Sequence, residues 1–219
     1  MKLPALLLWL LAIAGLARAD IVVVQRVDGA GQSGEQTIRV KDSKARCDIG
    51  GGAVSVIVDR QTGETTTLSH PQRGFLTLTP EANRAMLEKM KHVRGSQQAP
   101  PLVATGKKEK VGDYQCDIFT ADIGAVKMTY WLAKEYPNYQ TFISQLDVLE
   151  SAPLASAASG LAPRTKDLPG MPMKMLMEMS TQKVTISLLS AKEESADPAI
   201  FKIPAGYKEL PAPPAPTKP

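Results

Sequence analysis

Short segments in which apolar and polar residues alternate dominate the chain after residue 20, and this is the pattern of half-buried β-strands. The first group of such segments covers residues 21–27, 36–41, 44–49, 54–59, 64–68 and 74–78. Turn-forming residues separate them, as in Gly50-Gly51-Gly52 and Gln61-Thr62-Gly63. Segments this close together predict neighbouring hairpins of one antiparallel sheet.

Two later stretches change to the period of a helix. Thr79-Pro80-Glu81 is a helix start, with Thr at the N-cap, Pro at the first helical position and an acid in the first turn. The apolar stripe that follows contains Ala82, Met86, Leu87, Met90 and Val93. A second helix starts near Pro137, and its stripe contains Tyr139, Phe142, Ile143, Leu146 and Leu149. Alternating segments at 102–110, 114–121, 126–133, 171–180 and 183–191 predict further strands, so the fold class is α+β.

The first 19 residues have a different pattern. Met1-Lys2 precedes the apolar run 3–16, which ends in Ala17-Arg18-Ala19. This order predicts a secretory signal peptide cleaved after Ala19, and a periplasmic or secreted protein. No later apolar run reaches the ~18 residues of a membrane span. We therefore expect one domain over residues 20–210, and a disordered Pro-rich tail over 211–219.

Charge changes the picture little. The chain has 26 Lys plus Arg against 22 Asp plus Glu, and Lys2 and Arg18 lie in the predicted leader. The excess in the mature chain is too small for a nucleic-acid partner. With 43% hydrophobic and 22% charged residues, the chain has enough apolar content for a packed core.

The two cysteines acquire meaning from the predicted export. Alternation puts Cys47 in phase with Ala45 and Ile49, and Cys116 in phase with Tyr114 and Ile118, so both thiols should point inward. Two inward cysteines in an oxidising compartment predict a disulfide. The alternative is a pair of separate buried thiols. No sequence feature links either thiol to a histidine, which disfavours a catalytic cysteine.

A row of methionines is the most unusual feature of the chain. Met171, Met173, Met175, Met177 and Met179 occupy every second position, and a regular strand would put all five on one face. Three interpretations are open: a core face, the wall of an apolar ligand cavity, or a soft-metal site, since thioethers select Cu(I). Next-nearest side chains on a strand lie ~7 Å apart, too far for one ion to bridge without another element.

Motifs that carry catalysis are missing. The chain contains no phosphate-binding loop, nucleophile elbow, zinc-protease helix or Cys-x-x-Cys motif. Ser69 and His70 are adjacent on a predicted strand and therefore point to opposite faces, so they cannot form a nucleophile–base pair. We therefore expect a protein that is not an enzyme and holds no metal or other cofactor.

The order of strands and helices resembles the periplasmic lipoprotein-carrier (LolA-like) fold, and so does the hairpin Ile57-Val58-Asp59-Arg60-Gln61-Thr62-Gly63-Glu64. Gly170-Met171-Pro172-Met173-Lys174 and Phe201-Lys202-Ile203-Pro204-Ala205-Gly206-Tyr207-Lys208 resemble the C-terminal signature of the secreted family known as domain of unknown function 4412. The resemblance implies an open, strongly curved antiparallel sheet, a half-barrel of about ten strands, with two helices covering its concave face.

The leading hypothesis is an exported binding protein that holds an apolar ligand, such as an acyl chain, a lipid or a lipoprotein segment, between sheet and helices. We expect a monomer. The residues predicted to contact the ligand are Met173, Met175, Met177, Met179, Met128, Tyr130, Met86, Met90 and Phe142. The alternatives are a Met-rich protein that binds Cu(I), and a structural or adaptor module of the cell envelope that has no ligand.

Overall fold

The computed structural model describes residues 20–29, 31–94, 100–123, 126–151 and 163–211. The leader predicted for residues 1–19 and nearly all of the tail predicted for 211–219 lie outside these residues. No helix in the described ranges combines the length and the apolar character that a bilayer crossing requires.

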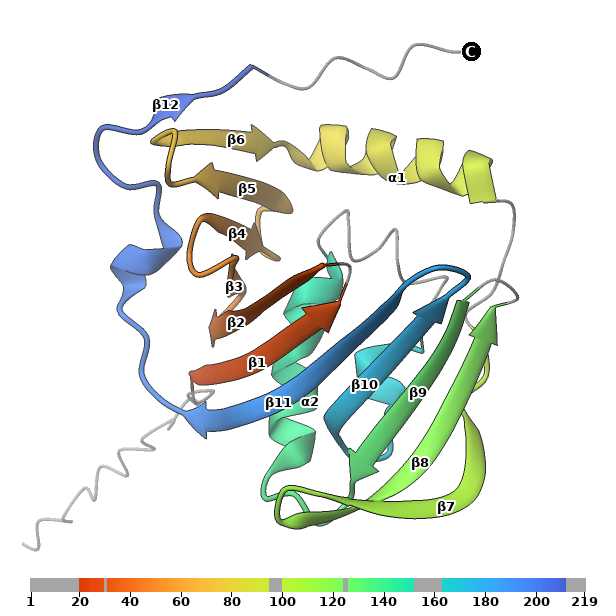
Figure 1. The fold of residues 1–219 in the computed structure, drawn as a ribbon. Coiled ribbons are helices and arrows are strands. Elements are labelled where there is room, and N and C mark those ends of the chain that lie inside the picture. Colours follow the sequence, from red (N-terminus) through yellow and green to blue (C-terminus); the bar gives the residue numbers. More distant parts are fainter. Residues whose placement is uncertain (1–19, 30, 95–99, 124–125, 152–162, 212–219) are drawn as a thin grey trace, which may run out of the picture.

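One sheet contains all twelve strands of the described chain (Figure 1). In chain order they are β1 (Ile21–Gly29), β2 (Gln32–Lys41), β3 (Lys44–Ile49), β4 (Val54–Asp59), β5 (Glu64–Ser69), β6 (Gly74–Leu78), β7 (Val103–Val111), β8 (Tyr114–Ile123), β9 (Val126–Ala133), β10 (Met171–Met179), β11 (Lys183–Glu193) and β12 (Lys208–Glu209). Across the sheet the order is β12-β6-β5-β4-β3-β2-β1-β11-β10-β9-β8-β7. Every pair is antiparallel except β12 with β6, which is parallel.

The helical elements lie on different sides of this sheet. They are α1 (Pro80–Arg94), α2 (Tyr139–Leu146) and the short 3₁₀ helices η1 (Asp147–Ser151), η2 (Thr165–Asp167) and η3 (Pro198–Phe201). The sheet bends so that α2 lies in its hollow, whereas η3 lies outside (Figure 1). We call these two sides of the sheet the concave and the convex face.

The prediction of an open, curved antiparallel sheet is confirmed in its class, and eleven of the twelve strands fall where alternation places them. The predicted number of about ten is too low, in part because Lys208-Glu209 is too short to show any alternation. Thr79 also caps α1 as predicted, since its Oγ1 accepts a hydrogen bond of 3.2 Å from the amide of Ala82.

The prediction that two helices cover the concave face holds for α2 alone. α2 packs on β10, and η1, which continues it, packs on β3 and β4. α1 packs on β5 and β6 instead, next to the edge strand β12. From Glu81 to Met86, every α1 side chain except that of Asn83 is exposed. Asn83 donates a 2.8 Å hydrogen bond to the Gly63 carbonyl, so a polar contact anchors the start of α1.

Three apolar clusters fill the two faces. The central cluster joins β1, β2 and α2, and includes Ile21, Val23, Ile38, Val40, Phe142, Leu146, Met171 and Met173. The β9 cluster includes Met128, Tyr130, Leu132, Ile143 and Leu168, with Met175 and Met177 packed against it. The convex-face cluster consists of Ile57, Leu68, Ala196 and Phe201, with Phe75, Ile200 and Tyr207 against it.

The predicted disulfide is absent, because Cys47 and Cys116 are both free thiols in the structure. The inference that they point inward is right: Cys116 is fully buried, and Cys47 packs against the same central cluster. However, Cys47 lies on β3 and Cys116 on β8, with β2, β1, β11, β10 and β9 between them in the sheet. Alternation gives the direction of a side chain but not its distance from a partner, and a disulfide needs Cα atoms within ~7 Å.

We expect two reactive thiols per chain when the protein is unfolded without reductant and titrated with Ellman's reagent. In the native state the reaction should be slow at pH 8, because Cys116 is fully buried and burial raises the pKa of the Cys47 thiol to about 11. Since only the thiolate reacts, the native rate should rise about tenfold per pH unit between pH 8 and 10. An unfolded chain without reactive thiols would show that the disulfide forms after all.

The C-terminal segment covers the convex face of the β3–β6 region. The Phe201 side chain is buried between this segment and the strands, and β12 adds itself to β6 at the edge of the sheet. The Ala196 amide donates to Asp20 Oδ2 at 3.1 Å, which fixes the beginning of the segment beside the start of β1. The segment therefore seals apolar side chains of β4 and β5 that the concave layer cannot reach.

Replacing Phe201 by Ala should lower the free energy of unfolding by about 3 kcal/mol, because it opens a cavity in the convex-face cluster. Chemical denaturation measures this change. The matched control is Ile203→Ala two residues later, where the side chain is 41% exposed and the loss should stay below about 1 kcal/mol. Equal losses in the two variants would contradict a sealing role for Phe201.

Candidate ligand-binding site

A cavity of about 280 Å³ lies between the concave face and the helical layer that covers it. Most of its wall is apolar, and the residues come from five strands, from α2, η1 and η2, and from the chain next to η2. They are Gln25, Ile38, Tyr130, Leu146, Leu149, Pro163, Thr165, Leu168, Pro172, Met175 and Ile186. Leu146 belongs to the central cluster and Tyr130 to the β9 cluster, so the cavity lies where the two clusters meet.

A β-bulge on β10 changes which methionines face this cavity. Met171 pairs with Ala133 of β9, whereas Met175 pairs with Tyr130, so four residues of β10 oppose three of β9. Met173 is the extra residue of the bulge, so the regular alternation of β10 is interrupted there.

The five methionines therefore do not form one regular row, and four of them divide between two clusters. Met171 and Met173 are buried in the central cluster. Met175, Met177 and Met179 continue on the face of Tyr130, Met128 and Val126, which are their register partners. This split works against a Cu(I) site made by one row of thioethers. Among the described residues, no group of three or more His, Cys, Asp or Glu side chains could hold a metal ion.

The remaining predicted ligand contacts divide into three groups. Tyr130 and Met175 line the cavity, and Met128 and Met177 belong to the same cluster without lining it. Phe142 lines a second, more open cavity of about 290 Å³, together with Tyr114 and Tyr136. Met86 is exposed on α1, and the side chain of Met90 lies outside the described part of the chain.

Of the polar groups on the cavity wall, the Gln25 amide was not found by sequence reasoning. Gln25 and Gln36 are register partners on β1 and β2, and Gln36 Nε2 donates to Gln25 Oε1 at 2.9 Å. The neighbouring register pair on the same face is Val23 with Ile38, and both of these side chains are almost fully buried. The sequence signal that could have revealed this pair is that its two glutamines alternate in phase with apolar residues of the same strands. Gln25 places an amide on a cavity wall that is otherwise mostly apolar.

Tyr130 carries a second polar group. Its side chain is 4% exposed, and its hydroxyl donates to the Met128 sulfur at 3.1 Å. Burial raises the pKa of Tyr130 to about 12, so the phenol keeps its proton at any physiological pH. A thioether is a weak hydrogen-bond acceptor. Within the described residues, Tyr130 is therefore a buried donor with only a weak acceptor.

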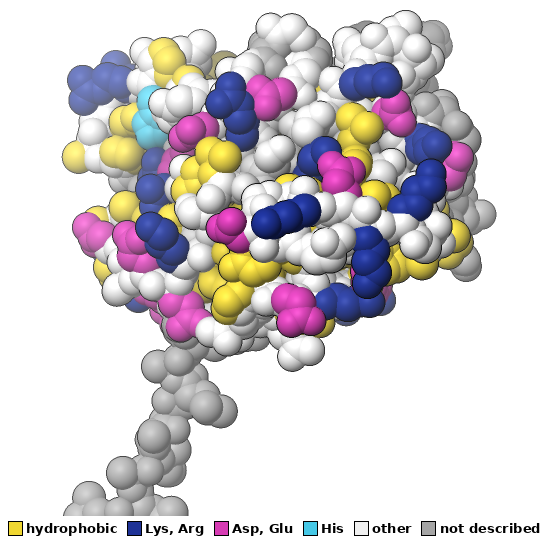
Figure 2. All heavy atoms as spheres, turned by 60° about the horizontal axis from the view of Figure 1, so that its bottom comes forward, with side chains coloured by type: hydrophobic (Ala, Val, Ile, Leu, Met, Phe, Trp, Pro, Cys, Tyr) yellow, Lys and Arg dark blue, Asp and Glu magenta, His cyan; other side chains and the backbone are white. Residues whose placement is uncertain are grey.

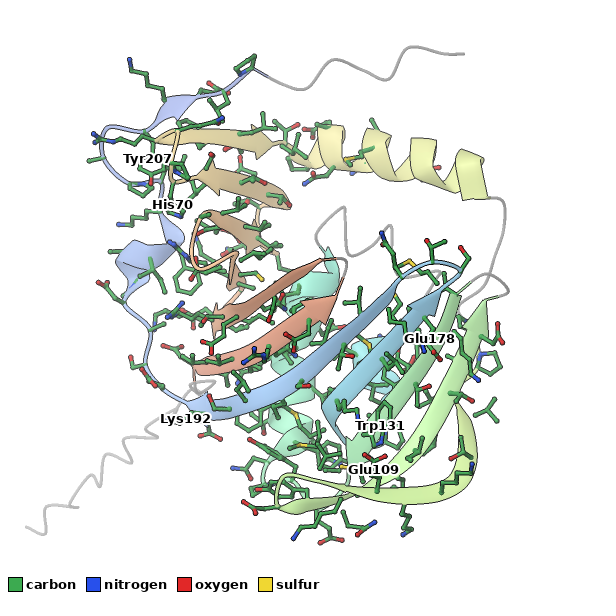
Figure 3. All side chains as sticks on the ribbon, viewed as in Figure 1. His70, Glu109, Trp131, Glu178, Lys192 and Tyr207 are labelled. Atoms are coloured by element: carbon green, nitrogen blue, oxygen red, sulfur yellow. The ribbon has the colours of Figure 1, made fainter. Side chains whose placement is uncertain are left out.

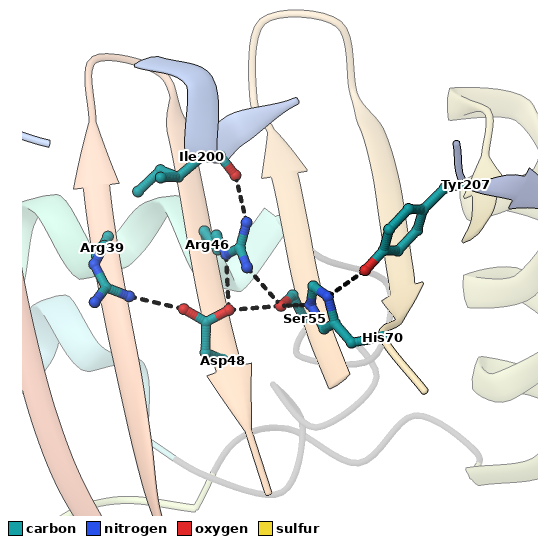
Figure 4. A network of polar contacts seen from close by, with 7 residues as sticks. All are labelled: Arg39, Arg46, Asp48, Ser55, His70, Ile200 and Tyr207. Carbon is teal, nitrogen blue, oxygen red and sulfur yellow. Dashed lines mark hydrogen bonds and ion pairs between the residues drawn. The ribbon is translucent and has the colours of Figure 1, made fainter. Parts of the chain in front are cut away.

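A different cluster of polar residues on the convex face contains serine, histidine and aspartate (Figure 4). Ser55 Oγ lies 2.7 Å from His70 Nε2 and 2.6 Å from Asp48 Oδ1. His70 Nδ1 lies 2.6 Å from the Tyr207 hydroxyl. Arg46 donates to both Ser55 and Asp48, and also to the Ile200 carbonyl of η3 at 2.6 Å. The cluster thus ties β3, β4 and β5 to the C-terminal segment.

The direction of these hydrogen bonds excludes a nucleophilic serine. The Asp48 carboxylate only accepts, so the Ser55 hydroxyl donates its proton there. His70 Nε2 must then donate to Ser55, while Nδ1 forms the hydrogen bond with the Tyr207 hydroxyl. A histidine that donates to serine cannot act as its base, and Ser55 is fully buried. Ser69, which precedes His70 in the sequence, makes no part of this cluster, as predicted.

Charges on the outer surface are mixed rather than gathered by sign. Figure 2 shows Lys and Arg side chains interspersed with Asp and Glu over the face that it presents, with apolar side chains between them. Trp131 and Glu109 lie side by side (Figure 3), and the Trp131 indole donates to Glu109 Oε2 at 2.7 Å. This hydrogen bond, followed by the nearby Lys174 ammonium, lowers the pKa of Glu109. Glu109 is thus paired with Trp131 and Lys174, which argues against a binding site at this point of the surface. The apolar cavity remains the candidate site.

Comparison with known families decides the relationship. The model of a family described as domain of unknown function DUF4412 matches residues 24–207. The chain belongs to this family. The resemblance seen in the sequence is thereby confirmed, and the match spans every strand of the DUF4412 chain except β12 and the first residues of β1. No curated protein sequence matches it.

Several solved structures are similar to this DUF4412 chain in fold. An uncharacterized conserved protein from Thermus thermophilus shares 7% identity at a TM-score of 0.50, over 88% of this chain and 90% of that one. A LolA superfamily protein from Nitrosomonas europaea shares 10% identity at a TM-score of 0.33, over 84% and 90%. PNGF-II shares 8% identity at a TM-score of 0.43, and this chain spans only 31% of the PNGF-II chain.

The structure gives physical reasons for the DUF4412 signature residues. At Gly170 an added Cβ would lie 2.9 Å from the Ala133 carbonyl carbon, so only glycine lets β10 start this close to the end of β9. Phe201 fills the convex-face cluster, and Tyr207 closes the hydrogen-bonded chain through His70. Gly170, Phe201 and Tyr207 do not line the cavity, whereas Pro172 of the same signature does.

Replacing Ser55 by Ala should lower the free energy of unfolding by about 2 kcal/mol, because buried partners of its hydroxyl on Arg46, Asp48 and His70 lose a hydrogen bond. Urea denaturation of the variant measures the loss. Ser69→Ala is the matched control beside His70, and it should change stability by no more than about 0.5 kcal/mol. If Ser69→Ala were the more damaging change, the assignment of Ser55 to this cluster would be wrong.

Proposed function

We propose that this protein is an exported, non-enzymatic, monomeric binding protein that holds an apolar ligand in the cavity between the concave face and α2. The observation that carries the proposal is the cavity of about 280 Å³ with a mainly apolar wall. Small-molecule sites are concave and mostly apolar, with a few polar groups that orient the ligand, and they occupy ~300–1,000 Å³. A volume just below this range suits one apolar chain or a small ring system.

The construction of the wall supports a ligand whose shape can vary. Met175 lines the cavity with a flexible, polarizable side chain. Met177 and Met128 pack in the same β9 cluster without lining the cavity. Leu146 and Leu149 come from α2 and η1, whereas Leu168 adjoins η2, so separate segments close the cavity opposite the sheet. A small displacement of one segment would admit a ligand without unfolding the strands that form the other wall.

The contents of the wall also bear on the non-enzymatic character. The serine–histidine–aspartate cluster lies on the convex face, behind the sheet as seen from the cavity, and its hydrogen bonds run in a non-catalytic direction. The polar side chains of the cavity wall are the phenol of Tyr130, the amide of Gln25 and the hydroxyl of Thr165, and the lining residues include no His, Cys, Asp or Glu that could act as a general base. Binding is the activity that such a wall supports.

Replacing Ile186 by Trp should fill the cavity from β11 and weaken binding of the apolar dye N-phenyl-1-naphthylamine at least about tenfold, which is about 1.4 kcal/mol. Dye fluorescence titration gives the dissociation constant. The matched control is Leu189→Trp on the same strand, where the side chain is 49% exposed and does not line the cavity. If the wild-type protein binds no apolar probe, or if the two variants bind the dye equally well, the proposed function is wrong.

A further inference from the structure

The charges around the cavity restrict its ligand more than its volume does. None of the eleven lining residues is charged. A carboxylate that entered this space would lose its hydration without gaining an opposite charge, and such burial is strongly unfavourable.

The polar groups on the wall are donors, however. Tyr130 presents an O–H whose acceptor, in the part of the chain that the structure describes, is the Met128 sulfur. A hydroxyl proton rotates freely about its C–O bond, so it can exchange the weak thioether for a stronger oxygen acceptor without any movement of the backbone. Gln25 accepts from Gln36 through Oε1, which leaves its own Nε2 as a second donor on the wall.

We infer that the cavity selects an acyl chain joined through a neutral carbonyl, as an ester or an amide, over the free carboxylate, and that Tyr130 donates a hydrogen bond to this carbonyl. The inference rests on the proposed function and names the class of ligand. The chain of the ligand would lie along the apolar wall of Leu146, Leu168 and Met175. Its carbonyl oxygen would replace the Met128 sulfur as the acceptor of the phenol proton.

The protonation of the phenol supports this role. Because burial holds the pKa of Tyr130 at about 12, the group donates and stays neutral throughout the physiological range. A phenolate would instead accept hydrogen bonds and would repel a carbonyl oxygen. The preference for a neutral carbonyl should therefore not change between pH 6 and 9.

Displacement of N-phenyl-1-naphthylamine tests the inference, since this dye has no carbonyl group. Methyl decanoate, N-methyldecanamide, decane and decanoate ion are the competing probes. On wild-type protein the ester and the amide should each bind about fivefold tighter than decane, which corresponds to one net hydrogen bond. Decanoate ion should bind at least about tenfold more weakly than the ester, because it would be buried without a counter-ion.

Tyr130→Phe removes the donor and keeps the ring. In this variant the ester and the amide should fall to the affinity of decane, while the affinities of decane and of the dye stay the same. Unchanged dye binding also shows that the variant is folded. Tyr139→Phe is the matched control, because Tyr139 packs against the same cluster but does not line the cavity, and it should leave all five affinities unchanged.

The outcomes separate this inference from the proposed function. The ester and the amide need not bind equally well, and the difference between them shows which linkage the cavity prefers. Either preference supports the inference when both probes bind more tightly than decane. If decane binds wild-type protein as tightly as both carbonyl probes, or if Tyr130→Phe keeps the preference, the inference fails while the apolar site stands. If the dye and all four competitors fail to bind, the proposed function fails with it.

Discussion

All strands in the described part of this chain belong to one sheet, so there is no second sheet to cover its apolar faces. Helices and loops must cover both faces instead. β3 shows the consequence within a few residues. Ala45 and Cys47 face the central cluster under α2 and η1, while Arg46 and Asp48 face the C-terminal segment. The sheet is thus the middle layer of three. The concave layer leaves a space between itself and the strands, whereas the convex layer is fastened by buried hydrogen bonds.

The cavity depends on two irregularities in this sheet. The bulge at Met173 turns Met175 and Met177 toward Tyr130 and Met128, so that flexible side chains gather on one wall. A second register shift lies between Val24 and Gln25 where β1 meets β11, and the residue after it carries the amide of the cavity wall. Both irregularities occur in long strands, and bulges increase the local twist of a strand.

Local patterns in the sequence predicted local structure well. Alternation located eleven strands, and the Thr79 cap located the start of α1, because each depends on residues within one turn or one hairpin.

Predictions that depend on distant pairs were less successful. Alternation cannot show a bulge, since Met173 breaks the face only through its partners on β9. It could not separate Cys47 from Cys116 either, because both point inward on strands that are far apart in the sheet. The Ser55–His70 contact was missed for the same reason. It joins β4 to the turn after β5, and the sequence pattern pointed to His70 but not to Ser55.

The pairing of β1 with β11 has a consequence for how the chain reaches this fold. Ile21 lies opposite Glu193, and Arg46 holds the Ile200 carbonyl, so the two ends of the described chain close the sheet at its centre and on its convex side. Contacts of such sequence separation form slowly, because the long loop between them must first be ordered. The hairpins β1–β6 and β7–β9 can form early, but they remain two unconnected sheets until β10 and β11 arrive between them. The chain therefore completes its hydrophobic core only when nearly its whole length is available, and until then it exposes the very strand edges that later join in the middle.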